Sequence, residues 1–204
     1  MIEDDVPSPI DLCDPQDARE WERTAQARPG RAEMFDAFVR ELRALRDDAL
    51  AVLDLGSGPG FLAAHLLDAI PSLRMSLLDF SAPMQELARA RLRSRSGQVT
   101  FVERSFKSPD WHLGLGPFDV VVTNQAVHEL RHKRYAYHLH AAVRQVLKPG
   151  GTYLVSDHFF GDGGLQHDQL YMTVAEQQAA LLAAGFSRAE QVAAFGSMVM
   201  HRAT

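Results

Sequence analysis

The sequence has 204 residues, of which 46% are hydrophobic, and this is enough chain to bury the core of one domain. Its formal net charge is −5, from 26 acidic and 21 basic side chains, which excludes the strongly basic footprint of a typical nucleic-acid-binding protein. The single cysteine, Cys13, excludes an intramolecular disulfide and a cysteine-based metal cluster. No apolar run approaches the about 20 residues that span a bilayer. Because the acidic start also lacks a signal peptide's basic region, we expect a cytoplasmic protein with no membrane contact.

Residues 1–30 are acidic and rich in proline, and they account for the whole net charge. Eight acids stand against three arginines there: Glu3, Asp4, Asp5, Asp11, Asp14, Asp17, Glu20 and Glu22 against Arg19, Arg23 and Arg28. We expect a partly mobile arm whose Trp21 either covers a ligand as a lid or only covers the edge of the core. Residues 31–204 are expected to form one domain, opened by an amphipathic helix over residues 31–46.

The most informative stretch is Val52-Leu-Asp-Leu-Gly-Ser-Gly-Pro-Gly60. Residues 51–55 form an apolar run typical of a buried strand, and an apolar helical pattern starts at Phe61. A strand, a glycine-rich turn and a helix in this order are typical of a doubly wound α/β sheet that binds a nucleotide-like ligand. Glycines accept positive φ and let a ligand touch the backbone, while free amides at the helix start attract negative charge.

The glycine spacing argues against a dinucleotide as that ligand. The dinucleotide pattern needs its third glycine three residues after the second, but Gly56, Gly58 and Gly60 follow one another at intervals of two. Phe61 stands at the position where that pattern needs close helix–strand packing. A tight strand–helix turn without any ligand remains the alternative for the glycines taken alone.

Three further strands are predicted over residues 74–79, 98–103 and 118–123. Asp79 ends the first of these, 19 residues after Gly60, where a carboxylate accepts hydrogen bonds from ribose hydroxyls. Ser81 is expected to cap the following helix, with Pro83 in its first turn. The arginines near the end of that helix are expected to form a solvated face: Arg89, Arg91, Arg93 and Arg95.

The second half continues the alternation of helices and strands. A helix is predicted over residues 132–147, ending in Leu147-Lys-Pro-Gly-Gly151, and a strand over residues 152–157. A glycine-rich irregular segment is expected over residues 158–172. Thr173 and Glu176 form a capping-box pattern that predicts a helix ending at Gly185. Short strands are expected over residues 187–192 and 197–201.

Four of these segments, in this order, resemble motifs of the class I S-adenosylmethionine (SAM)-dependent methyltransferases. They are the glycine stretch, Asp79, the Phe118-Asp-Val-Val strand and Leu147-Lys-Pro-Gly-Gly151. The resemblance covers about residues 31–202. It implies a mostly parallel seven-stranded sheet in the order 3-2-1-4-5-7-6, with an antiparallel last strand and helices on both faces.

The resemblance also implies SAM as the cofactor and a set of residues that bind it. The methionine part would lie over the glycine turn, and the ribose would meet Asp79. The family's acid for the adenine amino group is absent, and Ser105 and Phe106 stand in its place. The residues expected around SAM are Arg31, Asp54, Gly56, Ser57, Gly58, Gly60, Asp79, Phe80, Met84, Ser105, Phe106 and Asn124.

For the acceptor side, His128 is the first candidate for a general base, because the loop after the fourth strand lines that part of the cleft. A histidine that only shapes the pocket is the alternative, and Asp157 with His158 is the second choice. The segment Asn124-Gln-Ala-Val lacks the Asn/Asp-Pro-Pro-aromatic loop of nucleic-acid amino-methylases of this fold. We therefore expect a small-molecule acceptor, methylated on oxygen or nitrogen, with no nucleic acid and no metal. A SAM-binding or partner-binding protein without catalysis is the alternative from another class.

Overall fold

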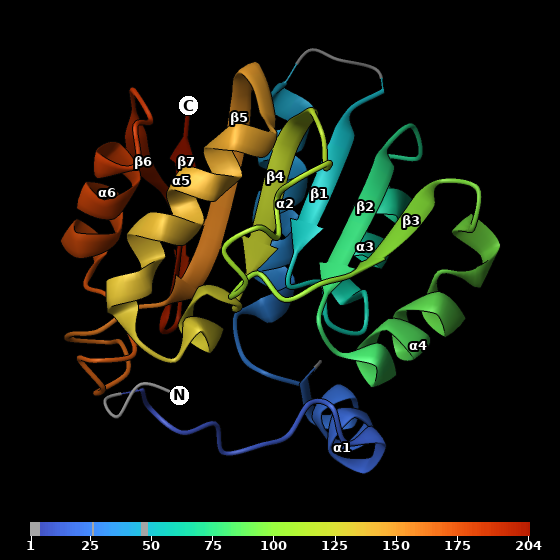
Figure 1. Ribbon diagram of the computed structural model, residues 1–204, viewed down its shortest axis with the longest axis horizontal. Coiled ribbons are helices and arrows are strands. Elements are labelled where there is room, and N and C mark those ends of the chain that lie inside the picture. The colour runs from blue at the N-terminus through green and yellow to red at the C-terminus, as the bar shows by residue number, and fades with distance from the viewer. Residues whose placement is uncertain (1–4, 26, 46–48) are drawn as a thin grey trace.

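In the computed structural model, which describes residues 5–25, 27–45 and 49–204, a seven-stranded sheet lies between two layers of helices (Figure 1). The strands run in the order β3-β2-β1-β4-β5-β7-β6. They are β1 (Ala51–Leu55), β2 (Arg74–Asp79), β3 (Val99–Glu103), β4 (Phe118–Asn124), β5 (Leu147–His158), β6 (Ala189–Phe195) and β7 (Met198–Ala203). The first five pair in parallel, and β7 is antiparallel to both β5 and β6. This confirms the predicted topology.

The helices divide between the two faces of the sheet. On one face, α2 (Arg31–Ala44), α3 (Phe61–Ala69) and α4 (Ala82–Arg91) pack against the strands in one core cluster. On the other face, α5 (Ala136–Val146) and α6 (Val174–Ala183) belong to a second cluster that includes Tyr153 and Phe186. Both faces of the central strands are thus covered, as parallel sheets require, and this explains the nearly continuous apolar runs of β1 and β4.

Local signals place the helix ends as expected. The Ser81 hydroxyl accepts from the Met84 amide at the start of α4. Thr173 and Glu176 form a reciprocal capping box at the start of α6. Short 3₁₀ turns η1 (Arg93–Arg95), η2 (Val127–Leu130) and η3 (Lys133–Tyr135) complete the described elements. None of the described helices is long and apolar enough for a membrane span.

Several boundaries differ from the sequence expectation. The arm contains a helix, α1 (Pro15–Ala25), which was not predicted. The helix expected over residues 132–147 starts as η3 and becomes α-helical only at Ala136. β5 starts at Leu147 because that residue already pairs with Phe118, so the Lys148-Pro-Gly-Gly151 segment lies within the strand. The end of the helix expected over residues 31–46 falls partly outside the described residues.

Candidate functional site

The glycine turn between β1 and α3 is built around positive φ angles of 74°, 52° and 76° at Gly56, Gly58 and Gly60. A Cβ atom on Gly56 would lie 2.5 Å from the Cβ of Ala126, so a side chain there would push away the loop that follows β4. A Cβ on Gly58 would meet nothing within 4 Å. The turn therefore holds the β4 loop close on one side and leaves open space above Gly58 on the other.

Asp79 ties this turn to the end of β2. Its Oδ2 accepts from the Gly58 amide at 2.7 Å, and its Oδ1 accepts from the Ser81 amide at 2.9 Å. Burial raises the pKa of the carboxyl, and these backbone hydrogen bonds oppose the rise. A carboxylate has about four lone-pair sites, so each oxygen keeps the capacity to accept a further hydrogen bond from a ligand hydroxyl.

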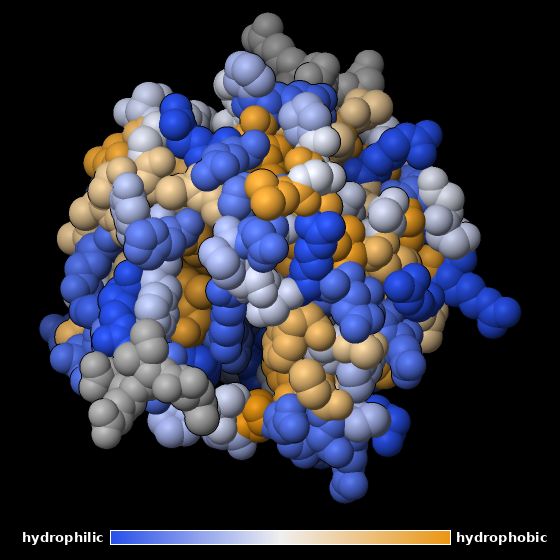
Figure 2. Space-filling view, viewed as in Figure 1, coloured by the Kyte–Doolittle hydropathy of each residue, from blue (hydrophilic) through white to orange (hydrophobic). Residues whose placement is uncertain are grey.

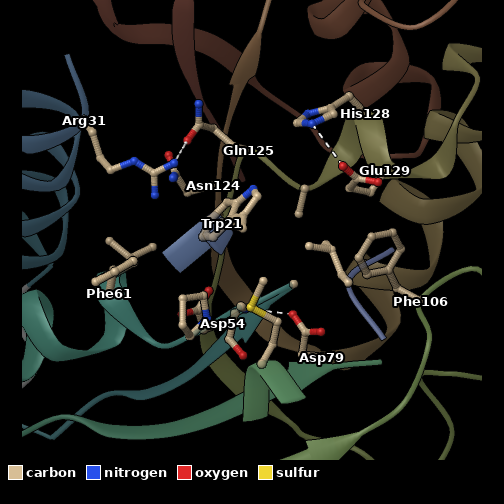
Figure 3. A pocket seen from close by; sticks show the side chains of 18 of the residues that line it. Trp21, Arg31, Asp54, Phe61, Asp79, Phe106, Asn124, Gln125, His128 and Glu129 are labelled. Carbon is tan, nitrogen blue, oxygen red and sulfur yellow. Dashed lines mark hydrogen bonds and ion pairs between the residues drawn. The ribbon is translucent and has the colours of Figure 1, made fainter. Parts of the chain in front are cut away.

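A cavity of about 190 Å³ opens above this turn, and most of the predicted cofactor residues line it (Figure 3). Ten of the twelve lie at its surface: Arg31, Asp54, Gly56, Ser57, Gly58, Asp79, Phe80, Met84, Phe106 and Asn124. Gly60 and Ser105 are not among the lining residues. Gly60 starts α3, and its role is conformational, because a Cβ there would lie 3.2 Å from the Cβ of Ala88.

Four buried polar atoms around this cavity have no hydrogen-bond partner among the described residues. They are Arg31 Nε, Asp54 Oδ2, Ser57 Oγ and Asn124 Oδ1. Desolvation and the charge of Asp79 raise the pKa of Asp54 to about 8. Burial, together with the nearby Arg28, lowers the pKa of Arg31 to about 10. Buried polar groups without partners are rare, so this concentration indicates a site that a polar ligand completes.

Gln125, which the sequence analysis missed, connects the two ends of the cavity. It has a positive φ of 56°, a conformation that costs a non-glycine residue roughly 1–3 kcal/mol and is concentrated at functional sites. Its Oε1 accepts from the Arg31 guanidinium, and its Nε2 lies 2.8 Å from His158 Nε2. Because the arginine can only donate, the amide nitrogen must face His158. His158 Nε2 is therefore an acceptor, and Nδ1 carries the proton and donates to Ser197 Oγ at 2.8 Å.

His128 and Asp157 form a hydrogen-bonded pair at the other end of the cavity. His128 Nδ1 lies 2.7 Å from Asp157 Oδ1, and its backbone amide donates to Oδ2 at 2.9 Å. His128 Nε2 lies 3.4 Å from Glu129 Oε1, beyond the usual hydrogen-bond length. Burial by itself would lower the pKa of His128, but the two carboxylates outweigh it and raise that pKa to about 10. The pair fixes the imidazole with Nδ1 protonated and directs Nε2 away from Asp157.

The predicted acceptor-side residues thus have different environments. His128 and His158 both line the cavity, whereas Asp157 lies behind His128 and acts through it. The two imidazoles have ring centroids 5.9 Å apart, and Tyr171 lies 5.6 Å from the His128 ring and 5.9 Å from the His158 ring. Burial lowers the pKa of His158, and Gln125 occupies its Nε2. Of the two histidines, His128 has only a long ion-pair contact at its outer nitrogen, to Glu129 at 3.4 Å, and this nitrogen can accept a proton when the imidazole is neutral.

The N-terminal segment crosses the mouth of the cavity, where Leu12 and Trp21 are lining residues. Arg131 Nε donates to the Val6 carbonyl at 2.9 Å, and the Ser81 hydroxyl donates to the Leu12 carbonyl. Trp21 lies near the centre of the site in Figure 3, with the Arg31 guanidinium 5.4 Å from its ring centroid.

Arg91 corrects the expectation of a solvated arginine face. It donates to the Pro59 carbonyl at 2.7 Å, pairs with Glu22 at 2.5 Å and lies over the Phe61 ring at 3.8 Å. It therefore fastens α1 to the glycine turn.

Comparison with known proteins agrees with this geometry. Residues 52–151 match the family model of the methyltransferase domain. The chain is 32% identical over 97 residues to a release factor glutamine methyltransferase of Bacteroides thetaiotaomicron, covering 48% of this chain and 33% of that protein. It is 38% identical over 80 residues to ribosomal RNA small subunit methyltransferase C of Klebsiella pneumoniae subsp. pneumoniae. This match covers 38% of this chain and 22% of that protein.

Among solved structures, human N-acetylserotonin methyltransferase in complex with SAM superposes with a TM-score of 0.69 and 20% identity, covering 93% of this chain and 56% of that one. Residues 52–151 are a methyltransferase domain. The fold of the chain is that of SAM-dependent methyltransferases. The chain spans less than two thirds of the length of each of these three proteins.

The described residues fit SAM. The ammonium of its methionine part can donate to Asp54 Oδ2 and Asn124 Oδ1, two acceptors without partners among the described residues. Its carboxylate can pair with Arg31, a buried cation that has no carboxylate partner in the described part of the chain. In contrast, no group of three or more His, Cys, Asp or Glu side chains in the described part of the chain is arranged to hold a metal ion.

Proposed function

We propose that this chain transfers the methyl group of SAM to a hydroxyl group of a small molecule. The observation that carries this proposal is His128, which is hydrogen-bonded to Asp157 through Nδ1 and lines the same cavity as the buried polar atoms of the expected cofactor residues that have no partner in the described part of the chain. A base held by a carboxylate within reach of a cofactor pocket suits an acceptor that must lose a proton.

Each group of SAM would contact residues of complementary charge or polarity. Asp54 and Asn124 would take the ammonium, Arg31 the carboxylate and Asp79 the ribose hydroxyls, while Phe80 and Phe106 would cover the adenine. When bound, SAM supplies a methyl group made electrophilic by its sulfonium centre. Binding a cation beside Asp54 would favour the ionised carboxylate, which is otherwise protonated in part at neutral pH.

The protein's part in the transfer is to align the acceptor, exclude water and receive one proton. Alignment of two reactants can supply roughly 7–11 kcal/mol of the barrier. As the new carbon–oxygen bond forms, the acceptor's O–H proton passes to His128 Nε2. Asp157 accepts a hydrogen bond from Nδ1–H throughout and stabilises the imidazolium that results.

The enclosure of the site favours a small acceptor. With Leu12 and Trp21 in place the cavity measures about 190 Å³, less than the roughly 300–1,000 Å³ of typical ligand pockets. These side chains must therefore shift outward when cofactor and acceptor enter. We infer that residues 1–30 act as an arm and lid, and that residues 31–204 form one SAM-binding domain.

Protein and RNA acceptors are the second possibility, because two of the sequence relatives are named for such substrates. The segment Asn124-Gln-Ala-Val argues against methylation of a nucleic-acid amino group, since it lacks the Asn/Asp-Pro-Pro-aromatic loop. A SAM-binding protein without catalysis is the remaining alternative.

A labelling experiment separates these functions. The protein is incubated with methyl-labelled SAM and, in separate reactions, with small phenols and alcohols, small amines, a glutamine-containing peptide and ribosomal RNA fragments. We expect label in hydroxyl acceptors. Label confined to peptide or RNA would overturn the acceptor class, and SAM binding without label in any acceptor would favour the non-catalytic alternative.

A further inference from the structure

A second cavity, larger than the first, lies between α5 and the segment that follows β3. Its volume is about 590 Å³, and we call it the α5 cavity. Figure 2 shows the surface hollowed below α5, with apolar side chains visible inside the hollow. The methyltransfer chemistry described above does not use this cavity.

The walls of the α5 cavity are mainly apolar and aromatic. Trp111, Phe106, Leu130, Leu139 and Ala142 line it and are each at most 8% exposed. The volume falls within the range of roughly 300–1,000 Å³ that is typical of pockets for small organic ligands. Such walls favour a flat ring or a short aliphatic body over a strongly hydrated ion.

Lys107 gives the cavity its charge. Its side chain is exposed at the edge of the cavity, where partial desolvation lowers the pKa of the ammonium group, and among the described residues this group has no hydrogen bond or ion pair. The charged groups that act on it are Glu129, Arg131 and Asp5, and Asp5 already accepts from the Tyr135 hydroxyl at 2.9 Å. His112 adds a buried Nδ1 without a partner in the described part of the chain. An unpaired cation beside an apolar wall is complementary to an organic anion.

Phe106 separates the α5 cavity from the cofactor cavity. It lines both, and among the described residues it is the only one that the two sets of lining residues share. His128, Asp79 and the glycine turn belong to the first cavity alone. A ligand in the α5 cavity would thus lie behind the expected adenine site and away from the acceptor wall.

We propose that the α5 cavity is a second binding site, which takes a small organic anion with an aromatic body, such as an aromatic carboxylate. The ring would lie between Trp111, Phe106 and Leu139, and the carboxylate would face Lys107. The site is independent of the methyl acceptor and is expected to bind whether or not SAM is present.

The probe is 1-naphthoate, titrated by calorimetry into the full-length protein that has been saturated with S-adenosylhomocysteine, so that the cofactor cavity is occupied. The neutral comparison ligand is 1-naphthalenemethanol, which keeps the rings and lacks the charge. We expect saturable naphthoate binding and about tenfold weaker binding of the alcohol, because a charge-assisted contact is lost.

Two variants locate the site. Lys107→Met keeps the apolar stem and removes the charge, and it should weaken naphthoate binding about tenfold without changing binding of the alcohol. Ala142→Phe should fill the cavity and abolish binding of both. Lys148→Met, at the start of β5 and outside the α5 cavity, is the matched control and should bind as the wild type does. S-adenosylhomocysteine binding checks that each variant is folded.

Three results would overturn the proposal: no saturable binding, displacement of naphthoate by S-adenosylhomocysteine, or equal affinity of the wild type and Lys107→Met. If Ala142→Phe does not fold, the Lys107→Met result still decides.

Discussion

The first cavity has two sides: the cofactor half, formed by the residues expected around SAM, and the acceptor wall, formed by Gln125, His128 and His158. Their polar side chains differ in whether they have hydrogen-bond partners. In the cofactor half, Arg31, Asp54, Ser57 and Asn124 each carry a buried polar atom that has no partner in the part of the chain that the structure describes. On the acceptor wall, the polar side chains satisfy one another through the His128–Asp157 pair and through the chain of contacts from Gln125 to His158 and Ser197.

This difference separates binding from chemistry. Unpartnered buried groups carry a desolvation penalty that a ligand of matching charge removes, so they identify what the site must bind. Groups that hold one another in fixed tautomers need no ligand to be satisfied, and they can give or receive a proton at one defined atom.

The largest effect is expected from His128→Ala, which removes the proposed base. At pH 9 to 10, where the neutral imidazole is populated, turnover should fall by about 10²-fold or more, because general base catalysis typically contributes roughly 10²–10⁴-fold. The affinity for S-adenosylhomocysteine should remain within a few fold of the wild type, since His128 is on the acceptor wall. Steady-state kinetics and calorimetry measure the two quantities.

His128→Gln is the matched control, because it keeps a polar side chain that cannot take up a proton. Low turnover in both variants supports the base, whereas recovery of most of the rate by glutamine would show that His128 only positions the acceptor. Unchanged turnover in both would remove His128 from the mechanism.

Asp79→Ala should give the next largest effect, on the cofactor half. Loss of a charge-assisted hydrogen bond is worth roughly 1.5–3 kcal/mol, so SAM affinity should fall about ten- to a hundredfold. Calorimetry with SAM measures it, and turnover at saturating SAM should change much less. Affinity equal to that of the wild type would show that Asp79 is only a structural residue and does not contact the ribose.

The pH dependence of kcat/KM should follow His128. Because its pKa is raised to about 10 in the free enzyme, the neutral imidazole is scarce at pH 7, and kcat/KM should rise about tenfold per pH unit from pH 7 to 9. Asp157→Asn removes the charge that stabilises the imidazolium and should shift the rise to lower pH. A profile that stays flat between pH 7 and 9 would contradict the raised pKa.

The smallest effect tests buried histidines far from the cavity. Burial, together with the neighbouring His201, lowers the pKa of His140 to about 3. Burial also lowers the pKa of His201 to about 4, although the backbone of Val174 opposes this shift. The unfolded chain takes up these protons near pH 6.5, so the free energy of unfolding should fall as the pH drops below that value. The slope should be about 1.4 kcal/mol per pH unit for each histidine.

Denaturant unfolding at pH 5 to 7 measures this slope. His201→Leu should reduce it by about half, while His138→Gln, an exposed position on α5, should leave it unchanged. If the slope is unaltered in His201→Leu, His201 is already protonated in the folded protein. Its buried ring would then not be the cause of the loss of stability at low pH.

The parts of the fold set by local sequence were predicted well. The bounds of β1 and β2, the Ser81 cap and the Thr173 capping box agree with the structure, because short apolar runs and capping side chains act within a few residues. The helix α1 was missed although local signals mark its start, where the Asp14 carboxylate accepts from the Gln16 and Asp17 amides and Pro15 is the first residue.

The candidate site shows the limit of local signals. The spacing of the glycine turn and Asp79 predicted that they lie together, because the carboxyl ends of parallel strands meet at one edge of the sheet. Both line the cavity. Gln125 was missed because its partner Arg31 lies 94 positions away in the chain. The His128–Asp157 contact spans 29 residues and depends on the β4–β5 register, which no local pattern reports.

Asp79 also has a thermodynamic consequence. Its carboxylate fixes the Gly58 and Ser81 amides, so the two loops that would flank the cofactor are cross-linked before any ligand arrives. Such a preorganised site loses little loop entropy on binding, and more of the contact energy is expressed as affinity. The binding heat capacity should then reflect the surface that the cofactor buries and the shift of Leu12 and Trp21, without a contribution from folding of these two loops.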